Sequence, residues 1–457
     1  MIFNKLDKSI TEKQYDLCII GAGPSGITLA LDISRRSSLN VLLLEAGDLN
    51  FSDSSQDFYK PHHFECKSNN ELVKVADKYL SRSRMRTMGG TSTIWDGWVK
   101  PLDSIDFKGH WPISKKDLDP YYSAVSPLLG LSDRKPFDKI FNTTSLRDTT
   151  LEITKRANFK EVFLKDLAKE KGIDLYLNTA ITNCSITKKT ITSIDVTNGS
   201  STYQIKAKHI VLAAGGIEST RILLNWNKEH NISNTHLGKY FHEHLIIPLE
   251  KSLYLYNDFT KKPLLSESFK RGFSLKEKIM IDNQLLNFSI YIDNLSSNQK
   301  EAPTNKAKEG KLYDALLFLE MTPVQESSIT LSKLKDKFSL NKINLNWKIS
   351  ENDFSSIPFI LKHVDTHLNL NKIGKLRQEL PSDYNRSILW EAHHHMGTTR
   401  LGKSKKEGVV DKNLRSFDYE NLYILSSSVY PYSGYSNPTM TLLALSIRLS
   451  NYLRNLS

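Results

Sequence analysis

The beginning of the chain carries the apolar pattern of a strand, a helix and a second strand. Residues 16–20 form an apolar run, which is typical of a strand buried in a parallel sheet. Residues 27–34 then place their apolar side chains at helical spacing, and residues 40–44 form the next apolar run. This pattern predicts one β-α-β unit of about 30 residues.

The same mixture of strands and helices returns further along the chain. Residues 174–177 and 209–213 have the apolar character of strands, and residues 218–226 have that of a helix. Ser114, followed by polar and acidic residues, is typical of a helix cap. We therefore expect an α/β fold with a Rossmann-like dinucleotide-binding domain, built from the separated residues 1–50, 81–250 and 386–457.

Residues 251–385 differ from both flanks. Residues 286–292 alternate apolar and polar side chains, which predicts half-buried antiparallel strands. We expect residues 251–385 to form a separate substrate-binding domain around an antiparallel sheet, so that the whole protein is α+β. Residues 296–311 have almost no apolar content and predict a mobile loop, and the polar residues 51–80 predict an irregular connecting or lid segment. A chain of 457 residues is also too long for one ordinary core.

A glycine-rich turn joins the first predicted strand to the first predicted helix. It reads Gly21-Ala22-Gly23-Pro24-Ser25-Gly26. In a dinucleotide site, such glycines permit the tight turn, the approach of backbone amides to the pyrophosphate and close helix packing. The positive end of the helix then stabilises the phosphate charge. Glu45 follows at about the 20-residue spacing expected of a carboxylate that binds a ribose hydroxyl, and it would repel the 2′-phosphate of NADP. The turn alone does not separate FAD from NAD.

Charge and composition narrow the class of protein. The formal net charge of +12 raises the question of an anionic partner, but the positive side chains are dispersed, so we interpret them as solvated surface and expect no nucleic-acid partner. No apolar run is long enough for a membrane span, and the first residues lack the apolar core of a secretion signal. We expect a cytoplasmic protein.

The three cysteines, Cys18, Cys66 and Cys184, have no metal-binding spacing and leave one thiol over, so we expect neither a zinc site nor a disulfide framework.

Two segments near the C-terminus carry the candidate reactive groups. One reads His393-His394-His395-Met396-Gly397-Thr398-Thr399-Arg400-Leu401-Gly402, and the other reads Ser436-Asn437-Pro438-Thr439. A histidine of near-neutral pKa can accept the hydroxyl proton of an alcohol, and an asparagine amide can donate to the developing alkoxide. Adjacent histidines rarely point at one metal ion, so we interpret His393 and His395 as packing or hydrogen-bonding residues. Asn437 has a second interpretation as the cap of a final helix.

Several motifs, in order along the chain, resemble those of the glucose–methanol–choline (GMC) oxidoreductases. Besides the fingerprint and the two C-terminal segments, they are Leu44-Glu45-Ala46-Gly47, Met88-Gly89-Gly90-Thr91-Ser92, Ala213-Ala214-Gly215-Gly216-Ile217-Glu218-Ser219, residues 238–244 and Gly408-Val409-Val410-Asp411. Within the family, the chain looks most like the pyranose oxidases and the bacterial sugar or polyol dehydrogenases, and the resemblance is weak across residues 250–385. It implies an FAD-dependent enzyme that oxidises a CH–OH group of a sugar, polyol or similar alcohol.

The resemblance also implies roles for individual residues. His394 would be the base, Asn437 would hold the substrate oxygen, and flavin N5 would take the hydride. No metal is implied. The residues expected to hold FAD are Gly21, Gly23, Pro24, Ser25, Gly26, Glu45, Ala46, Arg86, Gly89, Gly90, Thr91, Ser92, Ile181, Ala214, Gly215, Ser426, Ser427, Asn437, Pro438 and Thr439.

Two departures from the family pattern change these expectations. Covalent members of this branch carry a flavin-linked histidine two positions after the serine of the Met88–Ser92 turn. Ile94 stands there in this chain, so we expect non-covalent FAD. Ser426 stands where many members have an aspartate, which leaves the cofactor contact at that point open.

Three other functions stay open: a NAD-dependent dehydrogenase with a generic fingerprint, a flavin-bound lyase on the same fold, and a non-catalytic binding protein. The sequence also leaves open the identity and regiochemistry of the substrate, the oligomeric state and the role of the positive charge. The electron acceptor can be oxygen or another carrier, so oxidase and dehydrogenase are not separated.

Overall fold

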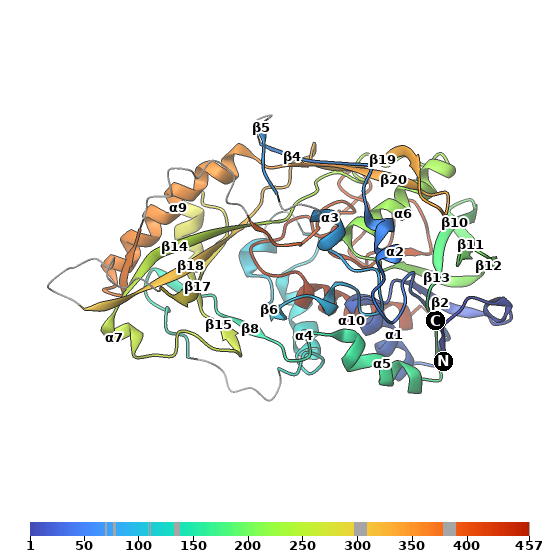
Figure 1. Ribbon diagram of the computed structural model, residues 1–457, viewed down its shortest axis with the longest axis horizontal. Coiled ribbons are helices and arrows are strands. Elements are labelled where there is room, and N and C mark those ends of the chain that lie inside the picture. The colour runs from blue at the N-terminus through green and yellow to red at the C-terminus, as the bar shows by residue number, and fades with distance from the viewer. Residues whose placement is uncertain are drawn as a thin grey trace.

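The computed structural model describes residues 1–68, 71–75, 79–107, 109, 111–131, 138–296, 309–377 and 390–456. A six-stranded parallel sheet, in the order β1-β9-β3-β2-β13-β23, forms the centre of one half of the molecule (Figure 1). Its strands are β1 (Ile2–Phe3), β2 (Tyr15–Ile20), β3 (Val41–Leu44), β9 (Ile173–Tyr176), β13 (Ala207–Leu212) and β23 (Leu422–Ile424). The predicted β-α-β unit is confirmed, because β2 and β3 pair in parallel across α1.

Five helices accompany this sheet, and their apolar faces share one core with the strands. α10 packs against α1 and α4, and α1 packs against α5. α4 starts where the sequence predicts, because the Asp117 carboxylate accepts a hydrogen bond from the Ser114 amide at 2.7 Å. The helices are α1 (Pro24–Arg36), α4 (Lys115–Val125), α5 (Phe159–Lys169), α6 (Gly216–Glu229) and α10 (Thr439–Arg454).

An antiparallel sheet forms the other half, in the order β21-β14-β18-β17-β16-β7, with β22 paired to β14. Its strands are β7 (Leu146–Asp148), β14 (His244–Tyr256), β16 (Gly272–Leu275), β17 (Phe288–Leu295), β18 (Gly310–Glu320), β21 (Gly374–Leu376) and β22 (Trp390–Glu391). The boundary predicted between residues 250 and 251 falls inside β14.

The expected half-burial of residues 286–292 is wrong. Ser289 and Tyr291 are as buried as the apolar Ile290 between them. The reason is that both faces of the sheet are covered. Ile290 belongs to an apolar core that α9 also joins, and Tyr291 belongs to a separate apolar cluster on the other face.

α9 (Glu351–Leu370) lies along the outside of this sheet (Figure 1) and was not expected within a sheet-rich region. Its buried apolar residues follow helical spacing and pack into the same core as β14 and β18. They are Phe354, Ile357, Ile360, Leu361, Val364 and Leu368. This periodicity was present in the sequence and was missed.

The described residues of segment 51–80 contain more regular secondary structure than predicted. β4 (His63–Ser68) pairs in parallel with β20 (Asn341–Lys348), and both belong to a four-stranded sheet in the order β19-β20-β4-β5. The strand was missed because its partner lies far away in sequence. The other strands of this sheet are β5 (Glu71–Leu72) and β19 (Ser328–Lys335).

The remaining elements are short or peripheral. Two three-stranded sheets contain β10 (Ala180–Thr187), β11 (Thr190–Thr197) and β12 (Thr202–Ile205), and β6 (Trp98–Val99), β8 (Leu151–Ile153) and β15 (Phe269–Lys270). The short helices are α2 (Asp53–Gln56), α3 (Tyr79–Arg82), α7 (Asn257–Thr260) and α8 (Glu277–Asp282). Most of the loop predicted at residues 296–311 lies outside the described residues. Across the described ranges, no helix combines the length and apolar character that crossing a membrane requires.

Candidate active site

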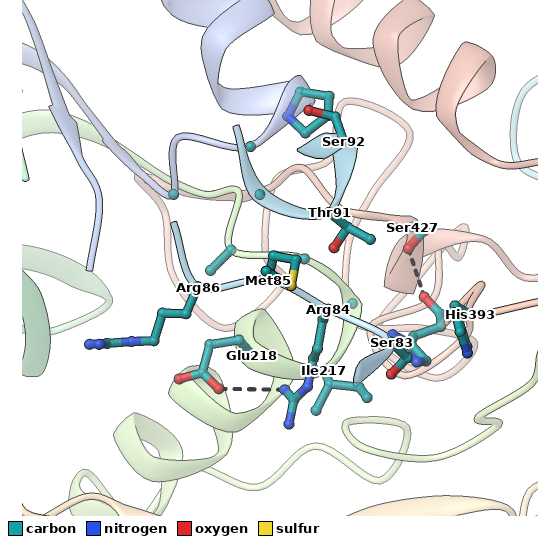
Figure 2. A pocket seen from close by; sticks show the side chains of 18 of the residues that line it. Ser83, Arg84, Met85, Arg86, Thr91, Ser92, Ile217, Glu218, His393 and Ser427 are labelled. Carbon is teal, nitrogen blue, oxygen red and sulfur yellow. Dashed lines mark hydrogen bonds and ion pairs between the residues drawn. The ribbon is translucent and has the colours of Figure 1, made fainter. Parts of the chain in front are cut away.

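A cavity of about 530 Å³ has walls from both halves of the molecule. Ile20 of β2 lines it on one side, and Ile246 of β14 and Phe318 of β18 line it on the other. Its size is within the range of sites for cofactors and small molecules. Figure 2 shows side chains of several separate segments around this space, Thr91 and Ser427 among them.

The fingerprint turn is packed too closely for side chains at two glycines and is open at the third. Gly21 has a φ of +109°, and a Cβ there would lie 2.5 Å from the Ala213 carbonyl oxygen. A Cβ on Gly26 would lie 2.0 Å from the Gly21 carbonyl oxygen. Gly23 lines the cavity, and a Cβ on it would meet nothing within 4 Å. Because α1 begins here without a side-chain cap, its first amides are suited to bind phosphate oxygens.

The second glycine-rich turn lies directly against the fingerprint. The Gly89 amide donates to the Ala22 carbonyl at 2.8 Å, and a Cβ on Gly90 would lie 3.2 Å from the Gly23 Cα. The Ser92 hydroxyl donates to the Gly89 carbonyl at 2.6 Å. Ser92 therefore fixes the shape of its own turn while it lines the cavity.

Glu45 is buried at the end of β3 and lines the cavity. Its two carboxylate oxygens accept hydrogen bonds from the amides of Ala22 and Gly47 at 2.9 and 2.8 Å. Each oxygen has a further lone pair. The carboxylate thus ties the fingerprint to the next strand and keeps the capacity to accept from a hydroxyl.

The structure brings most residues of the predicted site to this one cavity. Gly26 and Gly89 do not line the cavity. Gly26 contributes to the close packing of the fingerprint turn, and the Gly89 amide donates to the Ala22 carbonyl. Ser426 is fully buried off the cavity wall, and its hydroxyl bonds that of Ser428. The other predicted residues line the cavity: Gly21, Gly23, Pro24, Ser25, Glu45, Ala46, Arg86, Gly90, Thr91, Ser92, Ile181, Ala214, Gly215, His394, Ser427, Asn437, Pro438 and Thr439.

His394 and Asn437 meet in the wall of the cavity. Asn437 Nδ2 lies 3.3 Å from His394 Nε2. α10 begins after Pro438 without a side-chain cap, so the side chain of Asn437 is directed at the histidine instead of capping the helix as the second interpretation proposed. On the opposite edge of the ring, His394 Nδ1 lies 2.8 Å from Nδ1 of His244.

Glu243 holds the chain around these histidines. Its carboxylate oxygen accepts hydrogen bonds from the amides of Ala392 and His393 at 3.0 and 3.1 Å. His393 has a φ of +60°, so this turn needs such support. His395 packs its ring against Tyr79, with ring centroids 5.7 Å apart, in line with the packing role predicted for it.

Burial controls the protonation of His394 and His244. It lowers the pKa of His394 well below its ordinary value, and the neighbouring His244 lowers it further. Burial also lowers the pKa of His244 to about 3. The near-neutral pKa assumed from the sequence is therefore wrong for His394. Both imidazoles are neutral at physiological pH.

Sequence reasoning did not predict that Glu243 and His244 position His394. Glu243 and His244 are adjacent at the start of β14, and only strand pairing and the chain reversal near residue 393 bring them to the C-terminal segment. It also missed Arg84 and Glu218, whose charged groups lie 3.8 Å apart on the cavity wall (Figure 2). The motif of residues 238–244 was the one available signal for Glu243 and His244.

Comparison with known proteins finds a matching family model and a bacterial relative. Residues 323–446, which include His394 and Asn437, match the family model for GMC oxidoreductases. 2-Methyl-1,2-propanediol dehydrogenase of Mycolicibacterium austroafricanum is 26% identical over 285 residues, which are 57% of this chain and 50% of the dehydrogenase. The chain thus spans about half the length of that relative.

Two solved structures share the fold over nearly the whole chain. Pyridoxine 4-oxidase from Mesorbium loti has a TM-score of 0.68 at 18% identity and covers 96% of this chain and 99% of its own. Formate oxidase of Aspergillus oryzae RIB40 has a TM-score of 0.64 at 14% identity, over 98% and 99% of the two chains. Identities this low establish the fold alone, and the predicted fold class is confirmed. The chain is thus similar to the glucose–methanol–choline oxidoreductases over residues 323–446, and it shares its fold with the two solved structures.

Proposed function

We propose that this protein is an FAD-dependent oxidoreductase that oxidises a CH–OH group. The observation that carries the proposal is the pairing of His394 Nε2 with Asn437 Nδ2 at 3.3 Å in a cavity that also contains the dinucleotide fingerprint. A base, an oxygen-holding amide and a cofactor cradle in one space are the parts that alcohol oxidation needs.

The cavity residues fit FAD. The open Gly23 and the uncapped start of α1 suit the pyrophosphate, and Glu45 retains an acceptor for a ribose hydroxyl. FAD bound there would supply the hydride acceptor. The name of the formate oxidase structure also refers to FAD, which supports this cofactor over NAD. Because Ile94 replaces the flavin-linked histidine of covalent members, we propose that FAD is bound non-covalently.

The hydrogen bonds around His394 assign its protons. The Asn437 amide donates to Nε2, so Nε2 carries the lone pair and Nδ1 carries the proton. Nδ1–H then donates to Nδ1 of His244 at 2.8 Å. His394 Nε2 is in this way the acceptor for the substrate hydroxyl proton, and Asn437 Nδ2–H turns to the alkoxide oxygen.

The substrate and the electron acceptor are defined only in outline. A small sugar or polyol follows from the resemblance, and the diol in the name of the mycobacterial relative supports it. Ile246 and Phe318 of the antiparallel sheet line the cavity, which supports a substrate-binding role for residues 251–385 together with the start of β14. Oxygen or another carrier would reoxidise the flavin.

Anaerobic flavin reduction tests the proposal. The purified protein should show flavin absorbance, and an alcohol substrate should bleach it in a stopped-flow instrument. His394→Ala should bind FAD with an unchanged spectrum and reduce it about 10²- to 10⁴-fold more slowly, because the hydroxyl proton loses its acceptor. Asn437→Ala should slow reduction in the same direction.

The alternatives give different results. A protein without flavin absorbance that binds NAD is a dehydrogenase with a generic fingerprint. Flavin that stays oxidised while an alcohol is converted indicates a lyase. Flavin that no alcohol changes indicates a binding protein. Fast reduction in His394→Ala would show that His394 is not the base.

A further inference from the structure

One face of the antiparallel sheet continues directly from the proposed base into the cavity. His244, which contacts His394, and Ile246 lie two residues apart on β14 and therefore on the same face. Strand pairing places Trp390 of β22 and Phe318 of β18 on either side of Ile246. Leu316 lies two residues before Phe318 and therefore on the same face of β18.

These side chains form an apolar wall beside the reacting groups. Ile246, Leu316, Phe318 and Trp390 all line the cavity, and so does Trp98, whose ring centroid lies 5.9 Å from that of Phe318. We call these five residues the apolar wall. None of their side chains contains a strong hydrogen-bond acceptor. The backbone groups of Ile246 and Phe318 belong to the paired strands β14 and β18.

The side chains that β14 and β18 contribute to the cavity are all apolar, and its polar lining residues come from other segments. His394 and Asn437 line the cavity and lie 3.3 Å apart. Asp96 and His393, which also line the cavity, are exposed. Glu320 shares the sheet face, but it is buried off the cavity wall, where its carboxylate accepts from the Asn287 amide at 3.0 Å.

This distribution discriminates between classes of alcohol. Every hydroxyl of a sugar that is taken out of water needs an acceptor, and an unpaired one lowers affinity roughly 5- to 100-fold. An apolar substituent gains about fourfold in affinity for each methylene that it buries. One hydroxyl has partners in His394 and Asn437, and a second hydroxyl placed against the sheet would face the apolar wall.

We infer that the substrate is an alcohol with an apolar body, aromatic or branched aliphatic, whose reacting hydroxyl lies at His394 and Asn437 while the body packs on the apolar wall. This inference rests on the proposed function and replaces the carbohydrate with a less polar substrate class.

A matched panel of alcohols tests it on the FAD-bound enzyme. We would measure the second-order rate constant of anaerobic flavin reduction for the series 1-propanol to 1-hexanol, for benzyl alcohol and cyclohexylmethanol, and for glycerol, sorbitol and glucose. The rate constant should rise about two- to fourfold for each added methylene until the wall is filled. The cyclic apolar alcohols should exceed the polyols at least tenfold.

The isosteric pair Ile246→Val and Ile246→Thr provides the structural control. Both substitutions shorten the side chain at residue 246 by the same amount, but Thr has a hydroxyl where Val has a methyl group. Ile246→Thr should reduce flavin with 1-hexanol several-fold more slowly than Ile246→Val, with equal flavin content and spectrum in the two variants. If either variant fails to fold, the alcohol series with the unmodified enzyme decides.

The outcomes separate the two proposals. Reduction by sugars or polyols that equals or exceeds reduction by the apolar alcohols overturns the inference and leaves the proposed function standing. Equal rates in the Val and Thr variants also count against it. If no alcohol of either class reduces the flavin, the proposed function fails and the inference with it.

Discussion

The protonation of His394 is the residue-level feature with the clearest kinetic consequence. Burial lowers its pKa well below the ordinary histidine value of about 6.5. The lone pair on Nε2 is then present at neutral pH and is lost only as the pH falls through the lowered pKa. Flavin reduction should therefore be flat across neutral and mildly alkaline pH and decline only in acid. Stopped-flow rates from pH 5 to 9 measure this, and a half-maximal rate near pH 7 would contradict it.

His244 sets which nitrogen of His394 is free. His244→Phe removes the acceptor 2.8 Å from His394 Nδ1, which leaves a buried N–H unpaired at about 1–3 kcal/mol. His244→Gln keeps a carbonyl acceptor. We expect the Phe variant to lose roughly 10- to 100-fold in the limiting rate of flavin reduction, and the Gln variant to recover a large part. Similar rates in both variants would show that His244 only fills space.

At the level of elements, Glu243 connects the start of β14 to the turn that carries His394. Glu243→Ala leaves the partly buried amides of Ala392 and His393 without their partner, at up to about 1–3 kcal/mol for each donor. Glu243→Gln keeps a carbonyl oxygen for both. The Ala variant should unfold at a lower denaturant concentration and reduce flavin more slowly, while the Gln variant stays near the unmodified protein. Normal flavin reduction in a folded Ala variant would disprove the positioning role.

α9 offers a neighbouring pair of residues that separates burial from helix propensity. Ile360 is 0% exposed in the core beneath the sheet, and Phe359 beside it is 62% exposed. Ile360→Ala should destabilise by about 2–5 kcal/mol, because it leaves a cavity, and Phe359→Ala should change stability by at most about 0.5 kcal/mol. Denaturant midpoints followed by circular dichroism measure both. Equal effects would contradict the packing of α9 on the sheet.

At the level of the whole molecule, the cavity has walls from both halves, so the cofactor should stabilise them together. FAD that binds only the folded chain raises the melting temperature as its free concentration increases. Acid precipitation should release the flavin into the supernatant, because Ile94 provides no covalent attachment. Thermal melts across an FAD titration and the absorbance of the supernatant test the two statements. Flavin that stays in the pellet would show a covalent bond.

The sequence determined the features that depend on neighbouring residues. The apolar run of β2, the glycines of the fingerprint and the start of α4 follow from local sterics and capping, and the structure contains them as predicted. The histidine and asparagine of the C-terminal motifs were recognisable for the same reason, since each lies in a short segment of distinctive sequence.

Only the tertiary structure decided which of these groups meet and in what environment. The contact of His394 with His244, the support by Glu243 and the pairing of β4 with β20 join residues that are far apart in the chain. Many long-range contacts bury His394, which lowers its pKa, and others cover both faces of β17. The periodicity of a segment indicates which of its residues are buried, but it does not indicate which other part of the chain covers them.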